Sequence, residues 1–127
     1  MGLTFCIIDD ERDVCDILRL YFESRGHRCL IAHDGESGLK LIRQNKPAAV
    51  FLDLQMPRMN GYEVLTKLRA DETIRETPVM MMTALTRDPS LSDEQMANSA
   101  GANAFLSKPF ELDALLNAVE KITGVRI

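Results

Sequence analysis

The chain has 127 residues, 46% of them hydrophobic and 27% charged, which is typical of one soluble globular domain with its own apolar core. This composition excludes a disordered tail, and no apolar run is long enough to cross a bilayer. The net charge of −4 and the scattered basic residues argue against direct binding of nucleic acid, and we expect no membrane partner.

The N-terminus and the cysteines indicate the compartment. Residues 1–4 lead directly into an apolar segment, without the basic lead or cleavage site of a secretion signal. Cys6, Cys15 and Cys29 are an odd number and lack the paired spacing of a zinc site or a redox motif. We therefore expect a cytoplasmic protein with three reduced thiols in its core.

Five short apolar segments recur along the chain and alternate with stretches of helical periodicity. The predicted strands are Thr4–Ile8, Arg28–Ala32, Ala48–Leu52, Pro78–Met82 and Ala102–Leu106. Residues 50–52 and 79–82 are apolar throughout, as in strands covered by helices on both faces, and Met80–Met82 are expected to fill the core. This alternation predicts an α/β sandwich around a parallel sheet.

The stretches between the strands each carry one apolar face. The first helix presents Val14, Ile17, Leu18, Tyr21 and Phe22, and Gly26 is expected to form its left-handed C-terminal cap. The second runs from about Glu36 to Gln44, with Asp34 as its N-cap and Pro47 beyond its end. The third starts near Asn60 and carries Tyr62, Val64, Leu65 and Leu68, and the last presents Leu112, Leu115, Leu116, Val119 and Ile122.

Polar residues follow four of the predicted strands, at the sheet edge where ligands bind in such folds. Asp9, Asp10 and Glu11 follow the first strand, Asp53 the third, Thr83 the fourth, and Ser107 and Lys108 the fifth. Clustered acids raise one another's pKa and need a compensating charge. Oxygen-only ligands suit a hard cation, so Mg²⁺ fits this set better than zinc or copper. The alternative, that Asp9 and Asp10 only cap the first helix, does not account for Asp53.

The same residues are suited to phosphoryl transfer. A carboxylate such as Asp53 can act as a nucleophile and carry a phosphoryl group as an acyl phosphate. Lys108 supplies a mobile positive charge and Thr83 a hydroxyl, and both can bind phosphoryl oxygens. Taken singly, Lys108 could be a solvated lysine and Thr83 an ordinary strand residue, but their joint position favours a functional role.

Four fragments of the chain, taken in order, resemble the receiver domains of two-component response regulators. They are Ile7–Glu11, Leu52–Pro57 with Met59–Gly61, Thr83–Ala84 and Ser107–Phe110, and together they span nearly the whole chain. The resemblance implies a flavodoxin-like (βα)5 sandwich with a five-stranded parallel sheet in the order 2-1-3-4-5. It also implies a cis peptide bond between Lys108 and Pro109.

The resemblance further implies how the acidic residues divide the chemistry. Asp53 would be the phospho-acceptor. Asp9, Asp10, Asp53 and the backbone carbonyl of Gln55 would hold Mg²⁺, Asp10 directly and Asp9 through water. Lys108 would contact the phosphoryl group after transfer.

The switch residues implied by the resemblance are Thr83 and Phe105. Thr83 would close onto a phosphoryl oxygen and Phe105 would swing inward, although a purely structural role for this phenylalanine, which lacks a tyrosine hydroxyl, stays open. The chain is a few residues longer than usual between Thr83 and Lys108. The excess lies in Leu85–Asp93, where we expect a flexible loop before a displaced fourth helix.

The resemblance implies that a sensor histidine kinase or a histidine phosphotransfer protein donates the phosphoryl group from a phosphohistidine. The transfer would switch a protein-binding surface made by the fourth helix, fifth strand and fifth helix. The chain would be a signalling switch and not a metabolic enzyme, catalysing only its own phosphorylation and slow dephosphorylation, as a monomer or weak dimer.

Two alternatives remain open at this point. The first is a phosphorylation-independent binding module on the same fold. The second is an aspartate-nucleophile phosphohydrolase, which usually has a second acid two residues after the nucleophile, where this chain has Gln55.

No further site is predicted. His27 and His33 belong to no metal-ligand spacing and are expected at the surface. The chain shows no internal repeat, low-complexity stretch or interdomain linker, so we expect a single receiver domain over residues 1–127 without an output domain.

Overall fold

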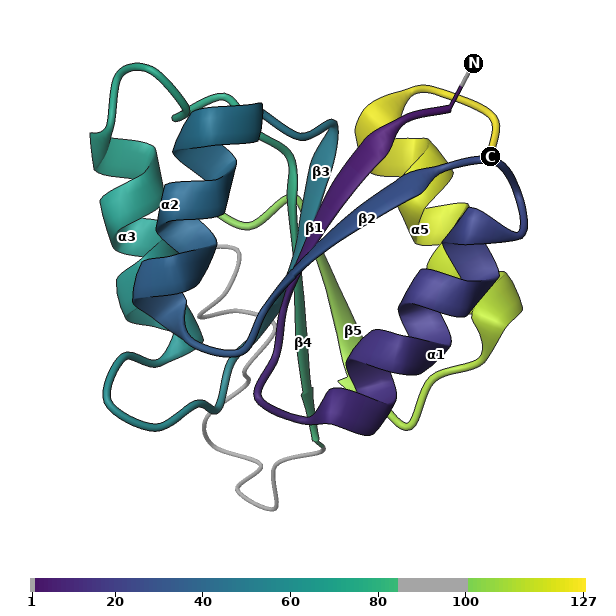
Figure 1. Ribbon diagram of the computed structural model, residues 1–127, viewed down its shortest axis with the longest axis horizontal. Coiled ribbons are helices and arrows are strands. Elements are labelled where there is room, and N and C mark those ends of the chain that lie inside the picture. The colour runs from purple at the N-terminus through teal and green to yellow at the C-terminus, as the bar shows by residue number, and fades with distance from the viewer. Residues whose placement is uncertain (1, 85–100) are drawn as a thin grey trace.

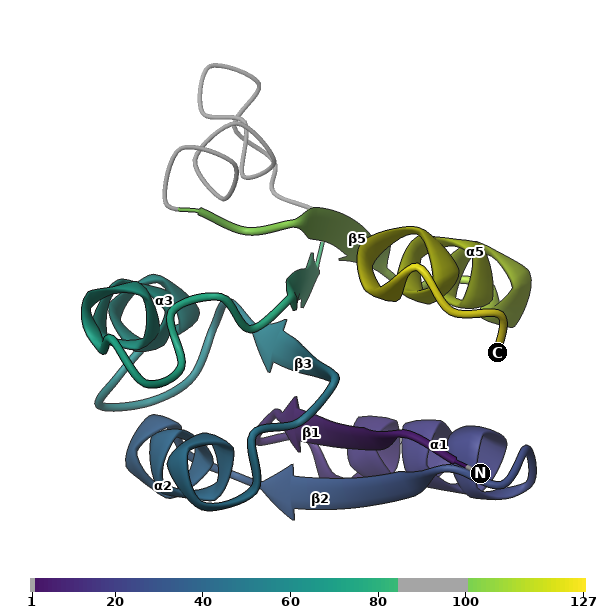
Figure 2. The same cartoon turned by 90° about the horizontal axis from the view of Figure 1, so that it is seen from above.

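The computed structural model describes residues 2–84 and 101–127. Five parallel strands form one sheet in the order β2-β1-β3-β4-β5: β1 (Thr4–Ile8), β2 (Arg28–Ala32), β3 (Ala49–Asp53), β4 (Val79–Ala84) and β5 (Ala104–Lys108). One face of the sheet is covered by α1 (Arg12–Glu23) and α5 (Leu112–Thr123), and the other by α2 (Gly35–Asn45) and α3 (Gly61–Ala70) (Figure 1, Figure 2). The predicted sandwich and strand order are therefore confirmed.

Three of the strands end later than the sequence predicts. β1 and β2 have the predicted bounds, but β3, β4 and β5 lie one or two residues closer to the C-terminus than Ala48–Leu52, Pro78–Met82 and Ala102–Leu106. The prediction ended each strand with its apolar run, whereas the parallel pairing continues through Asp53, Thr83 and Lys108. These three residues are consequently held by strands and not by loops.

Helix α1 packs on the sheet through one apolar stripe. Its fully buried side chains are Cys15, Leu18 and Phe22, in the three- and four-residue steps of an amphipathic helix. The prediction that Ile17 shares this face is wrong, because its side chain is 56% exposed. Gly26 has a φ of 87°, and the next N–H, of His27, donates to the Phe22 carbonyl, which closes the helix in the left-handed turn predicted there.

Helix α2 begins at the predicted cap Asp34, and α3 begins at the predicted start near Asn60. The Asp34 carboxylate accepts from the Ser37 N–H at 2.8 Å before α2, and the Asn60 side chain accepts from the Glu63 N–H at 3.0 Å before α3. In α5 the buried residues are Leu115 and Val119, whereas Leu112 is 39% exposed. The predicted Leu85–Asp93 loop and fourth helix lie outside the described residues.

Alternating side chains along the strands produce two apolar clusters, one on each face of the sheet. Beneath α1 and α5 lie Phe5, Ile7, Phe51, Met80 and Met82 with the helix residues that cover them. Beneath α2 and α3 lie Cys6, Ile8, Leu52 and Met81 with theirs. Residues 80–82 therefore fill the core on both faces, as predicted. Each large side chain buried in this way contributes roughly 1.5–3 kcal/mol, which holds the strand ends in place.

The three cysteines are free, with Cys6 and Cys15 buried and Cys29 half-buried. Burial is the main cause that raises the pKa of the Cys6 and Cys15 thiols to about 12 and that of Cys29 to about 11. The prediction of unpaired core thiols is confirmed for Cys6 and Cys15, whereas Cys29 lies at the edge of the core.

The prediction that His27 is a surface residue is wrong. Its half-buried ring lies 5.5 Å from the Phe5 ring and accepts a hydrogen bond from the Leu3 N–H at 3.0 Å through Nδ1. The segment before β1 runs beside the turn that carries this histidine, as the bond from the Arg28 N–H to the Leu3 carbonyl also shows. This contact joins residues far apart in sequence and leaves no local pattern.

Candidate functional site

Three aspartates meet at the carboxyl ends of β1 and β3. Ile8 and Leu52 are paired across these neighbouring strands, so Asp9 and Asp53, the residues that follow them, lie side by side. Asp9 is fully buried and Asp53 is 3% exposed, whereas Asp10 is exposed. One carboxylate oxygen from each aspartate lies within 4.8 Å of the other two. The structure thus brings together the acidic residues that the sequence predicts.

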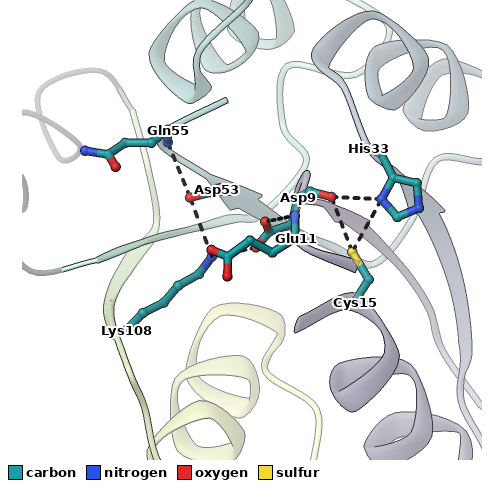
Figure 3. A network of polar contacts seen from close by, with 7 residues as sticks. All are labelled: Asp9, Glu11, Cys15, His33, Asp53, Gln55 and Lys108. Carbon is teal, nitrogen blue, oxygen red and sulfur yellow. Dashed lines mark hydrogen bonds and ion pairs between the residues drawn. The ribbon is translucent and has the colours of Figure 1, made fainter. Parts of the chain in front are cut away.

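Lys108 extends from the end of β5 into this acidic cluster (Figure 3). Its Nζ lies 2.7 Å from Asp9 Oδ2, 3.0 Å from Glu11 Oε1 and 3.7 Å from Asp53 Oδ1, and its side chain is 11% exposed. The peptide bond from Lys108 to Pro109 is cis, as predicted. The ammonium group therefore supplies the compensating positive charge that buried carboxylates need.

The pKa values of Asp53 and Lys108 are both raised, but for different reasons. Burial, and after it the charge of Asp9, raises the pKa of Asp53 to about 7, against the lowering effects of Lys108 and of the Gln55 N–H. Burial by itself would lower the pKa of Lys108, but its hydrogen bonds to Asp9 and Glu11 and the charges of Asp9 and Asp53 together outweigh burial and raise it. The lysine stays charged at neutral pH, while Asp53 without a bound cation titrates in the physiological range.

The backbone and side chains around Asp9 hold it in place. The Glu11 N–H donates to Asp9 Oδ1 at 2.9 Å. His33 Nδ1 lies 3.0 Å from the Asp9 carbonyl oxygen, which can only accept, so this nitrogen carries the proton and Nε2 faces Arg12 Nη1 at 3.4 Å. The Cys15 thiol also donates to the Asp9 carbonyl, at 3.4 Å.

The prediction that His33 is a surface residue is wrong, because its half-buried ring bonds to the Asp9 carbonyl just after β1 (Figure 3). Sequence reasoning missed both His33 and Cys15 as supports of Asp9. The nearness of β2 to the start of α1 brings them there, and no motif spacing marks it.

Thr83, Phe105 and Gln55 occupy distinct surroundings. The Thr83 hydroxyl is buried and has no hydrogen-bond partner among residues 2–84 and 101–127, which is unusual for a buried polar atom. Phe105 is half-buried and packs against the cluster beneath α2 and α3. The Gln55 N–H donates to Asp53 Oδ1 at 3.3 Å, and its side chain is exposed and points away from the carboxylate (Figure 3). The metal-binding role predicted for the Gln55 carbonyl stays a prediction.

The start of α3 lies directly against the backbone of Asp53. A Cβ atom added at Gly61 would be 2.5 Å from the Asp53 carbonyl oxygen and 2.8 Å from the Leu54 Cα. The Gly61 N–H donates to the Leu54 carbonyl at 2.8 Å. Because only glycine permits this approach, the start of α3 packs directly against the end of β3.

The donor set fits a divalent cation that prefers oxygen. Two carboxylates are buried, one is exposed, and no thiolate or imidazole belongs to the group. Such a set suits Mg²⁺, which typically takes one or two carboxylates and keeps several waters. The exposed Asp10 leaves one side of the cluster open to water, as that coordination requires.

Comparison with known proteins identifies the family. Residues 5–120 match the family model described as the response regulator receiver domain. Response regulator MprA of Mycobacterium sp. (strain KMS) is 40% identical over 116 residues, which cover 91% of this chain and 48% of the relative. A protein assigned as a response regulator from Chloroflexus aurantiacus J-10-fl is 31% identical with a TM-score of 0.89, covering 98% of this chain and 100% of that one.

A third comparison concerns the fold alone. The receiver domain of the sensor histidine kinase PA1611 from Pseudomonas aeruginosa PAO1 is 23% identical with a TM-score of 0.85, covering 98% of this chain and 100% of that one. That domain was crystallised with a magnesium ion coordinated in its active site cleft.

The chain belongs to the response regulator receiver domain family, whose members are signalling switches of two-component systems. Receiver domains interact with histidine kinases or phosphotransfer proteins and bind Mg²⁺ in an acidic pocket. The chain spans about half the length of the curated relatives it matches. Because the match covers only about half of these relatives, they do not support the expectation that nucleic acid is not a partner.

Proposed function

We propose that this domain accepts a phosphoryl group on Asp53 in a Mg²⁺-dependent reaction and thereby switches a protein-binding surface. The observation that carries the proposal is the position of Asp53. Its carboxylate is 3% exposed and lies within reach of two further aspartates and a lysine. A nucleophile, a cation site and a mobile positive charge are the groups that phosphoryl transfer requires.

The transfer begins with the ionised form of Asp53. A carboxylate oxygen attacks the phosphorus of a phosphohistidine, the P–N bond breaks, and its electron pair stays on the imidazole nitrogen, which takes a proton from solvent. The product is an acyl phosphate on Asp53. Lys108, which contacts Asp9 and Glu11 in the resting state, turns toward the new phosphoryl oxygens.

The acidic cluster would hold Mg²⁺ through Asp10, Asp53 and the Gln55 backbone carbonyl, with Asp9 acting through water. When bound, the cation neutralises negative charge on the carboxylates and on the incoming phosphoryl group. Asp9 would orient a water bound to the cation, and its own position is fixed by the Glu11 N–H, which donates to Asp9 Oδ1.

The Thr83 hydroxyl, which has no partner within the described part of the chain, supports the proposed switch role of this residue. A phosphoryl group adds strong acceptor oxygens and about −1.5 to −2 charge at neutral pH, so phosphorylation would offer the buried hydroxyl an acceptor. Movement of Thr83 changes the packing beside β5, where half-buried Phe105 lies. The surface of β5 and α5, together with the predicted fourth helix, would present this change to a downstream protein.

The test is phosphorylation by a small phosphodonor. The purified protein is incubated with acetyl phosphate and Mg²⁺ and analysed by intact mass, beside Asp53→Asn and, as a matched control, Asp113→Asn in the exposed first turn of α5. We expect one phosphoryl adduct in the wild type and in the control, none in Asp53→Asn, and none with a chelator.

Other outcomes would favour the alternatives. A folded protein that binds Mg²⁺ but forms no adduct would act as a phosphorylation-independent binding module. Rapid turnover of many phosphodonor molecules would indicate a phosphohydrolase, although Gln55 replaces the second acid that such enzymes use.

A further inference from the structure

Arg69, in the last turn of α3, uses all five of its N–H donors in bonds to residues outside its helix. Nε and Nη2 donate to the Gly101 carbonyl at 3.0 and 2.8 Å, and Nη2 also donates to Asn103 Oδ1 at 2.9 Å. Nη1 donates to the carbonyls of Arg75 and Thr77 at 2.8 and 2.7 Å. Burial lowers the pKa of this half-buried guanidinium from its usual value.

These bonds join α3 to the beginning of β5. The Asn103 side chain that accepts from Arg69 also accepts from the Val79 N–H at 2.8 Å, and the Asn103 N–H donates to the Val79 carbonyl at 2.8 Å. Val79 and Asn103 come immediately before Met80 and Ala104, the first residue pair of β4 and β5. Arg69 and Asn103 therefore form a clamp at the amino end of this strand pair.

The clamp and Lys108 lie at opposite ends of β5. β5 is an edge strand that pairs with β4 alone in the described sheet. A slip of one residue along such a strand turns every side chain to the opposite face. In the observed register Lys108 pairs with Ala84, and its ammonium group reaches Asp9 at 2.7 Å.

We propose that Arg69 is a positioning residue for phosphoryl transfer, which acts through Asn103 and the register of β5 on Lys108. The inference rests on the proposed function, since it concerns the placement of the lysine that binds the phosphoryl group. The five side-chain hydrogen bonds of Arg69 go to residues 75, 77, 101 and 103, whereas Asp9 and Asp53 lie at the ends of β1 and β3. Gly61, which packs against Asp53, lies at the opposite end of α3 from Arg69. Loss of the clamp should therefore impair phosphorylation without weakening the cation site.

The experiment compares Arg69→Met, which keeps an apolar stem and removes the donors, with the wild type. Mg²⁺ affinity is measured by calorimetry, and the phosphorylation rate with acetyl phosphate at saturating Mg²⁺. We expect Mg²⁺ affinity within about twofold of wild type, because the cation site is independent of the clamp. We expect phosphorylation about tenfold slower or more, because small displacements of a catalytic group are costly.

A double-mutant cycle distinguishes positioning from general stability. If Arg69 acts through Lys108, Arg69→Met should change the residual rate by less than about twofold in a Lys108→Ala background. If Arg69→Met slows phosphorylation by the same factor in the Lys108→Ala background as in the wild type, the proposal is overturned. Arg43→Met is the control. It removes the ion pair of 2.9 Å between Arg43 and Asp71, the residue that follows α3, and should be phosphorylated at the wild-type rate.

A second pair of variants keeps the test valid if Arg69→Met does not fold. Asn103→Ala removes the shared acceptor and should slow phosphorylation, whereas Asn103→Asp keeps an acceptor oxygen and should restore most of the rate. Equal rates in both variants and the wild type would overturn the proposal. Absence of an adduct in the wild type would instead refute the proposed function, so the two failures are distinguishable.

Discussion

The ammonium group of Lys108 lies 2.7 Å from Oδ2 of Asp9, a carboxylate that is completely buried. The same nitrogen is 3.7 Å from the proposed acceptor, Asp53. In the unphosphorylated protein Lys108 therefore pairs more closely with Asp9 than with Asp53. In the proposed reaction Lys108 changes partners, and we expect the contacts that hold it in the unphosphorylated protein to oppose that change.

Glu11 is the first of these contacts to test. Its carboxylate lies 3.0 Å from Lys108 Nζ but is 61% exposed, so the pair contributes about 0.2–1 kcal/mol. We expect Glu11→Gln to raise the phosphorylation rate with acetyl phosphate by about two- to fivefold, because Lys108 loses a competing partner. Glu63→Gln, at an exposed position in α3, is the control. A slower reaction in Glu11→Gln would show that this carboxylate assists the reaction.

The buried hydroxyl of Thr83 predicts opposite effects in the two states. Thr83→Val has nearly the same shape and removes a buried hydroxyl that no described residue pairs with, so the unphosphorylated protein should be as stable as the wild type or about 1 kcal/mol more stable in urea denaturation. On phosphorylation the wild type should show chemical-shift changes around β5 in its NMR spectra, and the variant should lack them. Clear destabilisation of the unphosphorylated form would mean that the hydroxyl already has a partner at rest.

The raised pKa of Asp53 predicts a pH dependence of stability. The folded protein binds this proton more tightly than the unfolded chain does, with a pKa of about 7 against 3.8, so stability is highest below pH 4 for this group and falls as pH rises toward 7. In a chelator, Asp53→Asn should therefore stabilise the protein by of order 2 kcal/mol at pH 8 and by much less at pH 4.5.

Denaturant titrations of both proteins at the two pH values check the Asp53 prediction. Asp16→Asn, an exposed acid on α1, should show no such difference. A gain of equal size at both pH values would contradict ionisation of Asp53 as its cause. Adding Mg²⁺ should stabilise the wild type more than Asp53→Asn, because the cation binds the ionised carboxylate.

The close packing of Gly61 against Asp53 predicts a coupled defect. In Gly61→Ala the new methyl group would approach the Asp53 carbonyl to 2.5 Å, so the backbone must shift. We expect a loss of about 1–3 kcal/mol in stability together with slower phosphorylation. Gly124→Ser is the control for glycine replacement, because a Cβ atom added at Gly124 would have no heavy atom within 4 Å. The φ of 70° at Gly124 adds some backbone strain to this variant. If Gly61→Ala is destabilised but phosphorylated at the wild-type rate, the packing of Gly61 does not affect the geometry of Asp53, and the prediction is wrong.

Much of the fold follows from patterns within each segment. Apolar runs of strand length and three- to four-residue steps determine the element order, and short polar side chains such as Asp34 mark the helix starts. The acidic cluster was also predictable, because parallel strands bring Asp9 and Asp53 to one edge. The strand ends were less so, since the pairing continues past the apolar residues through Thr83 and Lys108.

The supports of the site could not be predicted from sequence. His33 and Cys15 reach the Asp9 carbonyl only because β2 passes beside the start of α1. Arg69 reaches Asn103 across the α3–β4 connection, over a separation of 34 residues. Such contacts depend on tertiary packing, and the residue types involved are equally common at exposed positions.

The burial of Cys15 makes this thiol a natural reporter of opening at the edge of the site. Only the thiolate reacts with alkylating reagents, and a thiol that is 1% exposed with a pKa of about 12 is shielded in the folded state. The rate at which an alkylating reagent modifies Cys15 would therefore be proportional to the fraction of molecules in which α1 has locally separated from the sheet. Kinase docking, cation binding and phosphorylation could then each be followed as protection of one native side chain, without any introduced label.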